Sequence, residues 1–305
     1  MQAWQQRLAS LDPRAIWKYY ATPFQCMMTI TTVVLIGGEL ILARIVHLGG
    51  LSQILNAWPG LLLLVVVLYY CVVCSYPRLI DVCQLAIWAV LLTNILSLLI
   101  QIAGRSSQPL CDHALAAMDA RIQFSTAFFV QLAARAPLVE IALAITYSLI
   151  APLIIVALLL PALCGHSEAS RRFVLGVVIA AILTAALSAY WPAAGPWTTQ
   201  EIAPNREQAG VTAYLIRLKS NVPVVIDMNN AGIVSFPSFH VVLAMLSAVA
   251  LGSMRRLRVW VWMLAVLICI SAITTGWHYG VDLLGGMILG VVTILATSRI
   301  PRIYP

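Results

Sequence analysis

Long apolar runs recur along the whole 305-residue chain, and they constrain its fold more than any other feature. A run of about 20 apolar residues is as long as a helix must be to cross the roughly 30 Å hydrocarbon core of a membrane. Hydrophobic residues make up 62% of the chain and charged residues only 10%, which leaves too little polar surface for a water-soluble domain. A transmembrane β-barrel would show short segments of alternating polarity instead. The sequence therefore predicts an all-α, polytopic membrane protein.

The apolar runs predict about eight transmembrane helices. Residues 1–78 are expected to hold an interfacial N-terminal segment and two added spans, and residues 79–305 a six-helix core. Within that core, residues 105–137 predict an amphipathic helix lying on the membrane, and residues 192–237 a long polar loop. The first run lacks a small-residue cleavage site, so we expect an anchor and not a cleaved signal. The expected spans are 24–46, 54–76, 79–103, 138–162, 172–191, 238–254, 259–275 and 278–298.

Basic residues set the expected orientation, because the cytoplasmic loops of membrane proteins are enriched in Lys and Arg. With the N-terminus in the cytoplasm, eleven of the 18 basic residues lie on the inner side, and the short MRRLR turn at 254–258 is the firmest marker. Topology, and not nucleic-acid binding, then explains the net charge of +7. Both termini are expected in the cytoplasm. The compact loops and the lack of a sorting motif favour a bacterial inner membrane, with the site on the periplasmic side.

Two short motifs place histidines at the outer ends of predicted spans: SFPSFH at 235–240 and GWHYGVD at 276–282. His278 and Asp282 are four residues apart, so on a helix their side chains share one face. The carboxylate can accept a hydrogen bond from one imidazole nitrogen, which leaves the other nitrogen as a nucleophile. His240 enters at the same membrane depth from another span, where it can donate a proton to a leaving oxygen.

Groups that favour an anion accompany these histidines. Ser238 supplies a hydroxyl donor, and Pro237 suits the first turn of the helix that begins here. The start of that helix is favourable for negative charge. Arg217 and Lys219, in the preceding loop, can supply positive charge. Together these residues describe a phosphate site. No cofactor is expected. A zinc site made by the two histidines and the aspartate fits less well, because Ser238 and the basic loop suit phosphate better than a metal.

SFPSFH followed by HYGVDLLGG resembles the motifs of the type 2 phosphatidic acid phosphatase superfamily, which contains membrane lipid phosphatases and phosphotransferases. The likeness covers roughly residues 140–298 and is greatest to the inositol phosphorylceramide synthase branch, with its FPSxH and HYxxDxxxG motifs and a turn similar to WPAAGPW. The resemblance implies that His278 takes the phosphoryl group and that Asp282 orients it. It also implies that His240 protonates the leaving lipid alkoxide or phosphate, and that Ser238 holds phosphate oxygens.

The chain departs from the superfamily pattern in three places. An arginine six residues before the nucleophilic histidine is replaced by Ala272, and the glycine of the PSGH motif by Phe239. The first motif, a lysine followed seven residues later by arginine and proline, is absent. Arg217 is the expected substitute for the missing cation, Lys219 the second choice and Arg206 the third. The missing arginine weighs against simple phosphatase activity.

The sequence therefore predicts an enzyme that acts on a lipid phosphoester at the outer face through a covalent phosphohistidine. Transfer to water would make it a phosphatase, and transfer to a lipid or sugar alcohol a phosphotransferase. Phosphatidic acid-like lipids, polyprenyl phosphates, lipid A-type phosphates and phosphoinositol lipids are the expected substrates. The alternatives are a transporter or flippase and a protein that only binds lipid phosphate. Ionisable residues cluster at one interface and not at the midplane, which favours the enzyme over a transporter.

Other polar and small residues are expected to be structural. Glu39 is expected to pair with Arg44 near the end of the first span and not to act as a relay. Asp227 is expected to cap the loop before the SFPSFH motif. Three glycines of the last span are expected to allow close helix packing: Gly285, Gly286 and Gly290.

Overall fold

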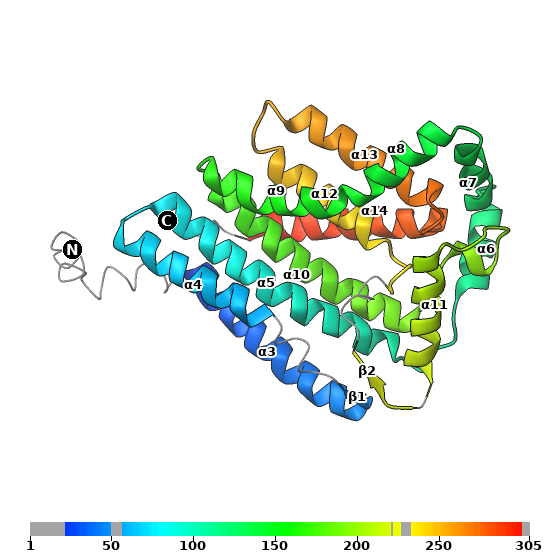
Figure 1. Cartoon of the computed structure of the whole chain (residues 1–305), viewed down its shortest axis with the longest axis horizontal. Helices are drawn as coiled ribbons and strands as arrows, with labels where there is room; N and C mark the ends of the chain where they lie inside the picture. Colours follow the sequence, from blue (N-terminus) through cyan, green and yellow to red (C-terminus); the bar gives the residue numbers. More distant parts are fainter. Residues whose placement is uncertain (1–21, 50–56, 221, 227–232, 301–305) are drawn as a thin grey trace.

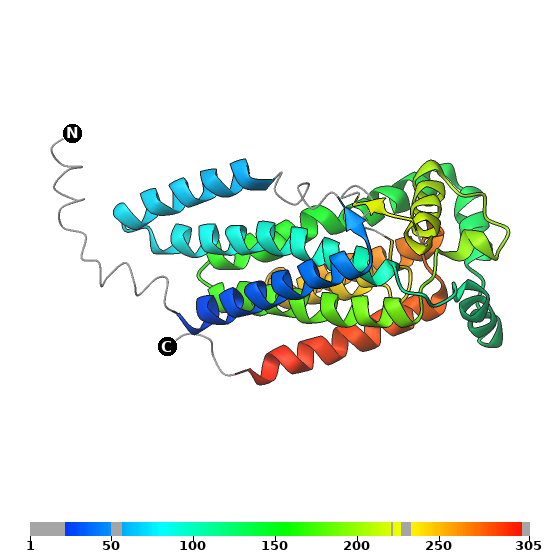
Figure 2. The ribbon, with the colours of Figure 1, turned by 90° about the horizontal axis from the view of Figure 1, so that it is seen from below.

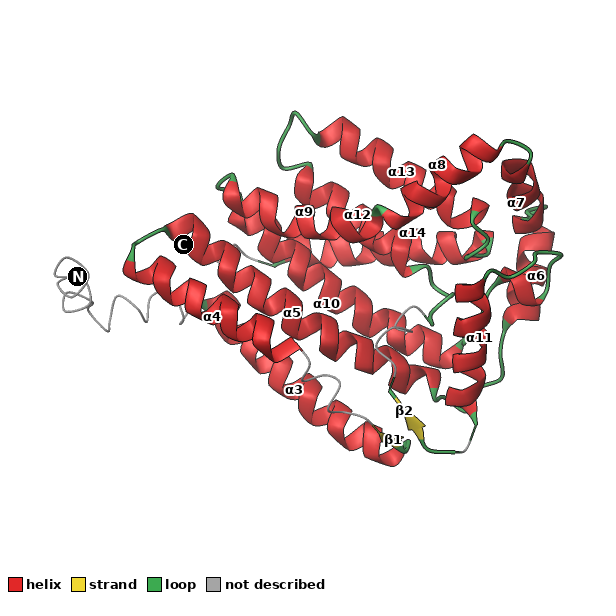
Figure 3. Cartoon of the chain, viewed as in Figure 1, coloured by secondary structure: helices red, strands yellow, loops and turns green. Residues whose placement is uncertain are grey.

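The computed structural model describes residues 22–49, 57–220, 222–226 and 233–300. The predicted interfacial segment at the N-terminus and Asp227 lie outside these residues. Within them the chain is an all-α membrane protein whose long helices pack side by side, as predicted (Figures 1 and 3). The long or apolar helices are α3 (Pro23–Ile45), α4 (Trp58–Val73), α5 (Pro77–Gly104), α8 (Pro137–Ser148), α9 (Ile150–Leu163), α10 (Ser167–Tyr190), α12 (Phe239–Leu251), α13 (Arg258–Thr274) and α14 (Gly280–Arg299).

Four of these helices, α3, α5, α10 and α14, are each long and apolar enough to cross a membrane. Helices α8 and α9 together pass the same test as a fifth, bent span, and α4, α12 and α13 are shorter apolar helices. These helices fall in the eight predicted segments, but the number of spans remains a prediction. The expectation of one continuous helix over 138–162 is wrong, because the chain bends by 40° at Leu149. Pro152 explains the break, since it has no N–H to donate to the carbonyl of Ser148 and its ring crowds that carbonyl.

Shorter elements gather at one end of the bundle, and the turns that join α4 to α5 and α9 to α10 lie at the other end (Figures 1 and 2). A two-residue parallel pairing of β1 and β2, which the sequence did not predict, joins the end of α3 to the segment after α11. The shorter elements are α6 (Asp112–Arg121), α7 (Thr126–Ala134), the 3₁₀ turn η2 (Pro196–Thr198), α11 (Arg206–Lys219), β1 (Leu48–Gly49) and β2 (Val224–Val225).

The insertion at 105–137 contains two helices, α6 and α7, where the sequence predicted one. Gln123, between them, adopts a left-handed φ of 56°, and the side chain of Ser125 caps α7 by accepting a hydrogen bond from the N–H of Phe128. Helix α6 packs against α14, and α7 packs against α13. The insertion therefore covers the ends of the two helices that flank the second histidine motif.

The expected ion pair between Glu39 and Arg44 is absent from the described residues. Glu39 is buried and its Oε1 has no hydrogen-bond partner in the part of the chain that the structure describes, whereas Arg44 is exposed. Side chains five residues apart point in different directions around a helix, whereas those three or four apart lie on one face. Glu39 therefore faces the packed side of α3 and Arg44 faces outward.

Close packing between α12 and α14 depends on glycine, as predicted. A Cβ atom added at Gly286 would lie 2.5 Å from the carbonyl oxygen of Ser238. One added at Gly290 would lie 2.8 Å from the Sδ of Met245, and one at Gly285 2.9 Å from the ring of Phe236. The start of α12 can therefore approach α14 only because these positions carry no side chain.

Gly286→Ala is expected to push the start of α12 away from α14, because backbone and not a flexible side chain stands in the way. We expect a loss of about 1–3 kcal/mol in stability, as for overpacked cores, measured as a lower melting temperature in detergent. Gly37→Ala in α3 is the matched control, since nothing lies within 4 Å of a Cβ there. Equal melting temperatures for both variants would contradict the close approach.

Candidate active site

The two histidine motifs meet where α12 and α14 begin side by side. Ser238 is the N-cap of α12 and Tyr279 the N-cap of α14, and the N–H of Ser238 donates to the carbonyl of Asp282 at 3.0 Å. The rings of His240 and His278 lie with their centroids 5.8 Å apart. The structure thus brings together four side chains that the sequence singled out for phosphate chemistry.

His278 is held by a backbone carbonyl. It is buried, and its Nδ1 lies 3.1 Å from the carbonyl oxygen of Ser235 but 3.5 Å from Oδ2 of Asp282. A carbonyl only accepts, so Nδ1 carries the proton and Nε2 is left with its lone pair. His278 lies in the turn between α13 and α14, outside both helices, and burial lowers its pKa to about 4. The imidazole is therefore neutral at neutral pH, as a nucleophile must be.

Asp282 braces the site and makes no normal hydrogen bond to the imidazole. Its fully buried Oδ2 accepts from the hydroxyl of Ser235 at 2.8 Å and from the N–H of Tyr279 at 2.9 Å. Ser235 therefore links the two groups, because its hydroxyl donates to Asp282 while its carbonyl accepts from His278. Sequence reasoning assigned no role to Ser235, although it is the first residue of SFPSFH.

An aromatic wall supports His240. The ring of Tyr147 stacks on His240 with centroids 4.6 Å apart and an interplanar angle of 19°. Trp277 lies parallel to Tyr147 at 6.2 Å. Tyr147 lies in the last turn of α8, next to the bend at Leu149, so the bend between α8 and α9 places it at the site. No local pattern in the sequence distinguished Tyr147 from other apolar-run residues.

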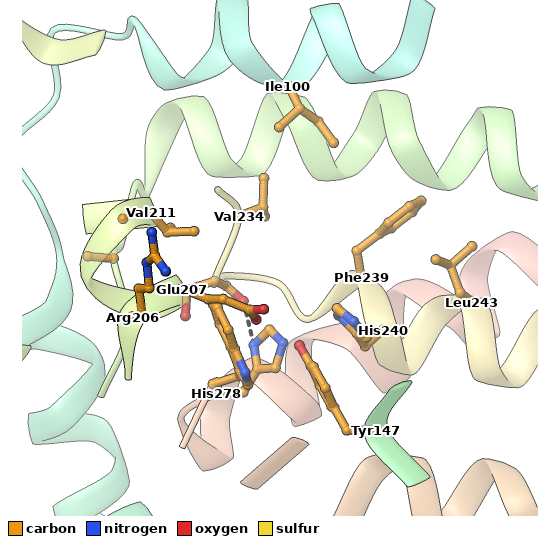
Figure 4. A pocket seen from close by; sticks show the side chains of 14 residues that line it. Ile100, Tyr147, Arg206, Glu207, Val211, Val234, Phe239, His240, Leu243 and His278 are labelled. Carbon is orange, nitrogen blue, oxygen red and sulfur yellow. Dashed lines mark hydrogen bonds between the residues drawn. The ribbon is translucent and has the colours of Figure 1, made fainter. Parts of the chain in front are cut away.

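A cavity of about 850 Å³ opens in front of the two histidines. Figure 4 shows Tyr147, His240 and His278 around one space, with Arg206 and Glu207 entering from the start of α11. Phe239 and other apolar side chains form the rest of the wall. The cavity therefore combines a nucleophile, a second imidazole, one cation, one carboxylate and an apolar surface, which suits an amphipathic phosphate ester.

The structure does not bring Arg217 or Lys219 to this cavity. Arg217 is exposed, and the Nζ of Lys219 donates to the carbonyls of Ser106 at 3.1 Å and Gln108 at 2.8 Å. Eleven residues of α-helix span about 16 Å, and the residues of α11 that line the cavity all lie between Arg206 and Val211. Arg206, the third choice from the sequence, is the basic residue among those that line the cavity.

Ser238 is fully buried, and its Oγ has no hydrogen-bond partner among the described residues. It is not among the residues that line the cavity, although His240, two residues later, is. The prediction that Pro237 lies in the first turn of α12 is wrong, because Pro237 precedes the N-cap residue Ser238. In the part of the chain that the structure describes, no three His, Cys, Asp or Glu side chains are grouped to hold a metal ion.

A family model described as the PAP2 superfamily matches residues 113–296, which is more than half of the chain. The chain belongs to the PAP2 superfamily. Enzymes of the PAP2 superfamily are generally phosphatases, so membership points to phosphatase or phosphotransferase chemistry in an integral membrane protein. The match begins within α6 and includes both histidine motifs. Comparison with curated proteins and with solved structures finds no match.

Proposed function

We propose that this PAP2-superfamily protein is a lipid-phosphate phosphatase or phosphotransferase that works through a phosphohistidine on His278. The observation that carries the proposal is the cavity in which His240 and His278 face the same space (Figure 4). A buried neutral imidazole with one nitrogen held by a carbonyl has the geometry of a nucleophile and not of a surface histidine. The apolar walls fit a substrate that carries a lipid chain.

The reaction divides into two steps. In the first, Nε2 of His278 attacks phosphorus and the bond from phosphorus to the leaving oxygen breaks. His240, whose protonated form is favoured by the negative charge of the bound phosphate, gives that oxygen its proton. In the second, the now neutral His240 takes a proton from water or an alcohol. The oxygen of that acceptor attacks phosphorus and releases His278. Tyr147 keeps the His240 ring in place throughout, since the two rings are stacked.

The phosphoryl oxygens are expected at the start of α12, near Arg206. The first N–H groups of α14 are already bound by Asp119 and Asp282, so that helix end is not free for an anion. Phe239 and His240, the first residues of α12, line the cavity, and helix N-termini favour negative charge. Ser238 is the N-cap of the same helix, and its hydroxyl has no partner among the described residues, which fits the phosphate-binding role implied by the family motif.

Arg206→Gln is expected to lower kcat/KM about tenfold, mainly by raising KM, because a charge-assisted contact to phosphate is worth about 1.5–3 kcal/mol before solvent screening. Arg217→Gln, on the same helix but away from the cavity, is the matched control and should leave both constants unchanged. Steady-state kinetics on one lipid phosphate measures both variants. A larger loss of kcat/KM in Arg217→Gln than in Arg206→Gln would show that the phosphate binds near the end of α11.

Orientation, membrane and partners complete the proposal. We place the cavity on the periplasmic face of a bacterial inner membrane, with both termini in the cytoplasm. In support, the basic turn at 254–258 joins α12 and α13 at the end of the bundle away from α11 (Figure 1). The donor is a phosphatidic acid-like, polyprenyl, lipid A-type or phosphoinositol lipid, and the acceptor is water or a lipid or sugar alcohol. The SFPSFH and HYGVD motifs favour the inositol phosphorylceramide synthase branch.

A product assay tests this function. The protein purified in detergent is incubated with a panel of these lipid phosphates, and free phosphate and new phospholipids are measured. Free phosphate would establish a phosphatase, whereas a new phosphorylated lipid with little free phosphate would establish a transferase and identify its acceptor. Absence of turnover across the panel, with binding retained, would instead favour a lipid-binding protein or a transporter.

A further inference from the structure

The turn that carries His278 is bound by a carboxylate from another part of the chain. Asp119, near the end of α6, is fully buried. Its Oδ2 accepts from the N–H of Gly280 at 2.8 Å, and its Oδ1 accepts from the N–H of Val281 at 2.8 Å. Each oxygen therefore satisfies one of the free N–H groups that begin α14, where the helix dipole also favours negative charge.

A second carboxylate of α6 binds the residue next to His278. Asp112 accepts from the N–H groups of Ala194 and Gly195, the latter at 2.8 Å, and from the hydroxyl of Tyr279 at 3.2 Å. It is 4% exposed. Asp112 and Asp119 are seven residues apart, which is about two turns, so one face of α6 presents both. Asp112 thus ties the WPAAGPW segment to the histidine motif.

The insertion also holds the backbone of His278 itself. The hydroxyl of Thr126, the first residue of α7, donates to the carbonyl of His278 at 3.1 Å. The carbonyl of residue 278, the side chain of 279 and the N–H groups of 280 and 281 are therefore all bound by residues of 112–126. The same segment supplies none of the cavity lining.

Energetic cost indicates what these carboxylates do. Burying a carboxylate without a cation is expensive, and the described residues form no ion pair to Asp112 or Asp119. Backbone N–H groups and a tyrosine hydroxyl offset that cost. These donors belong to the histidine turn and to the segment packed on it. The hydrogen bonds of Asp112 and Asp119 therefore stabilise one geometry of the turn that carries His278.

We propose that Asp119 and Asp112 are positioning residues that hold His278 in line with the phosphorus atom, a role that rests on the nucleophilic function proposed for His278. Neither touches the cavity, so neither contacts the substrate. A displacement of about 1 Å at a reacting atom can lower a rate by about 10². Loss of either carboxylate should therefore lower kcat and leave KM nearly unchanged, because Arg206 and the start of α12 still hold the phosphate.

Asp119→Asn is the sharpest variant, because it keeps the shape of the side chain. Its one carbonyl oxygen can accept from Gly280 or Val281, but its NH₂ group faces the other N–H. We expect kcat to fall about 10- to 100-fold with KM within about twofold of the wild type. Asp112→Asn, which can still accept one hydrogen bond, should show a smaller loss in the same constant.

Asp81→Asn is the matched control. Asp81 accepts from Arg171 at 2.7 Å in a partly buried ion pair between α5 and α10, away from the cavity. Its loss should lower the melting temperature and leave kcat per folded protein unchanged. If the loss of kcat in Asp119→Asn merely follows its melting temperature, or if KM rises as much as kcat falls, the positioning role is overturned.

Hydrogen exchange gives a readout that does not need activity. In Asp119→Asn, amide exchange should become at least several-fold faster in residues 276–282 and stay unchanged at the far ends of α5 and α10. Unchanged exchange in 276–282 would overturn the proposal even if no lipid phosphate is turned over. Faster exchange in a protein without His278-dependent turnover would support the contacts of Asp119 with the histidine turn and reject the proposed function. Failure of the positioning role and failure of the proposed function therefore give different results.

Discussion

His278→Ala is expected to abolish turnover, with a loss of about 10⁴-fold or more, because the variant has no atom that can carry the phosphoryl group. In the wild type, Nε2 of His278 faces a cavity shared with His240 while Nδ1 is held by the Ser235 carbonyl. Removal of the ring also removes the covalent intermediate. Rapid quenching with labelled lipid phosphate should therefore trap an acid-labile phosphoprotein in the wild type and none in the variant.

His113→Ala is the control. His113 lies within the region that the family model matches, is exposed on α6 and does not line the cavity. It should keep wild-type turnover and the trapped intermediate. Gel filtration and the melting temperature must show that His278→Ala is folded, since His278 is buried. A folded His278→Ala protein with turnover within tenfold of the wild type would reject the histidine nucleophile and, with it, the two-step mechanism.

His240→Ala is expected to lower turnover of an alkyl phosphate lipid by about 10²–10⁴-fold, the range for loss of a general acid. The loss should depend on the leaving group. An alkoxide must be protonated as it leaves, whereas a nitrophenolate is stable without a proton. With an aryl phosphate, formation of phosphohistidine should therefore be nearly as fast in the variant as in the wild type, and the intermediate should accumulate because its breakdown still needs a base.

The contrast between the two substrates is what tests the assignment. His166→Ala, at an exposed histidine before α10, is the control and should behave as the wild type with both. An equal loss on alkyl and aryl phosphates would show that His240 only shapes the cavity or holds phosphate. Pre-steady-state measurement of nitrophenol release separates formation of the intermediate from its breakdown.

Local patterns were enough to predict the fold class. Apolar runs long enough to span a membrane appear as α3, α5, α10 and α14, and shorter runs appear as α4, α12 and α13. The meeting of His240 and His278 was also predictable, because each lies at the outer end of a predicted span, and the family match includes both motifs. Gly286 predicted a close approach between helices, and in the structure the carbonyl of Ser238 is the group that lies against it.

The predictions and the structure differ where the surroundings of a residue depend on how its helix bends or packs and not on its neighbours in the sequence. The basic residues of α11 were ranked without knowing which end of that helix meets the cavity, and it is Arg206 and not Arg217 that lines the cavity. The apolar run over 138–162 hid a bend, because Pro152 near the start of a second helix looks like any other residue in a hydropathy pattern. Glu39 and Arg44 were paired by their spacing along the chain, although that spacing separates them around the helix.

The sequence by itself determined that this protein is a helical membrane protein with two histidine motifs of phosphate chemistry, because composition, run length and motif spacing are local properties of the chain. Only the tertiary structure decided what surrounds those histidines. Tyr147 reaches His240 because the chain bends between α8 and α9, and Asp112 and Asp119 reach the turn after His278 from an insertion more than 150 residues earlier. Such contacts leave no periodic or local signal, since they depend on how distant helices pack and on which buried N–H groups then need an acceptor.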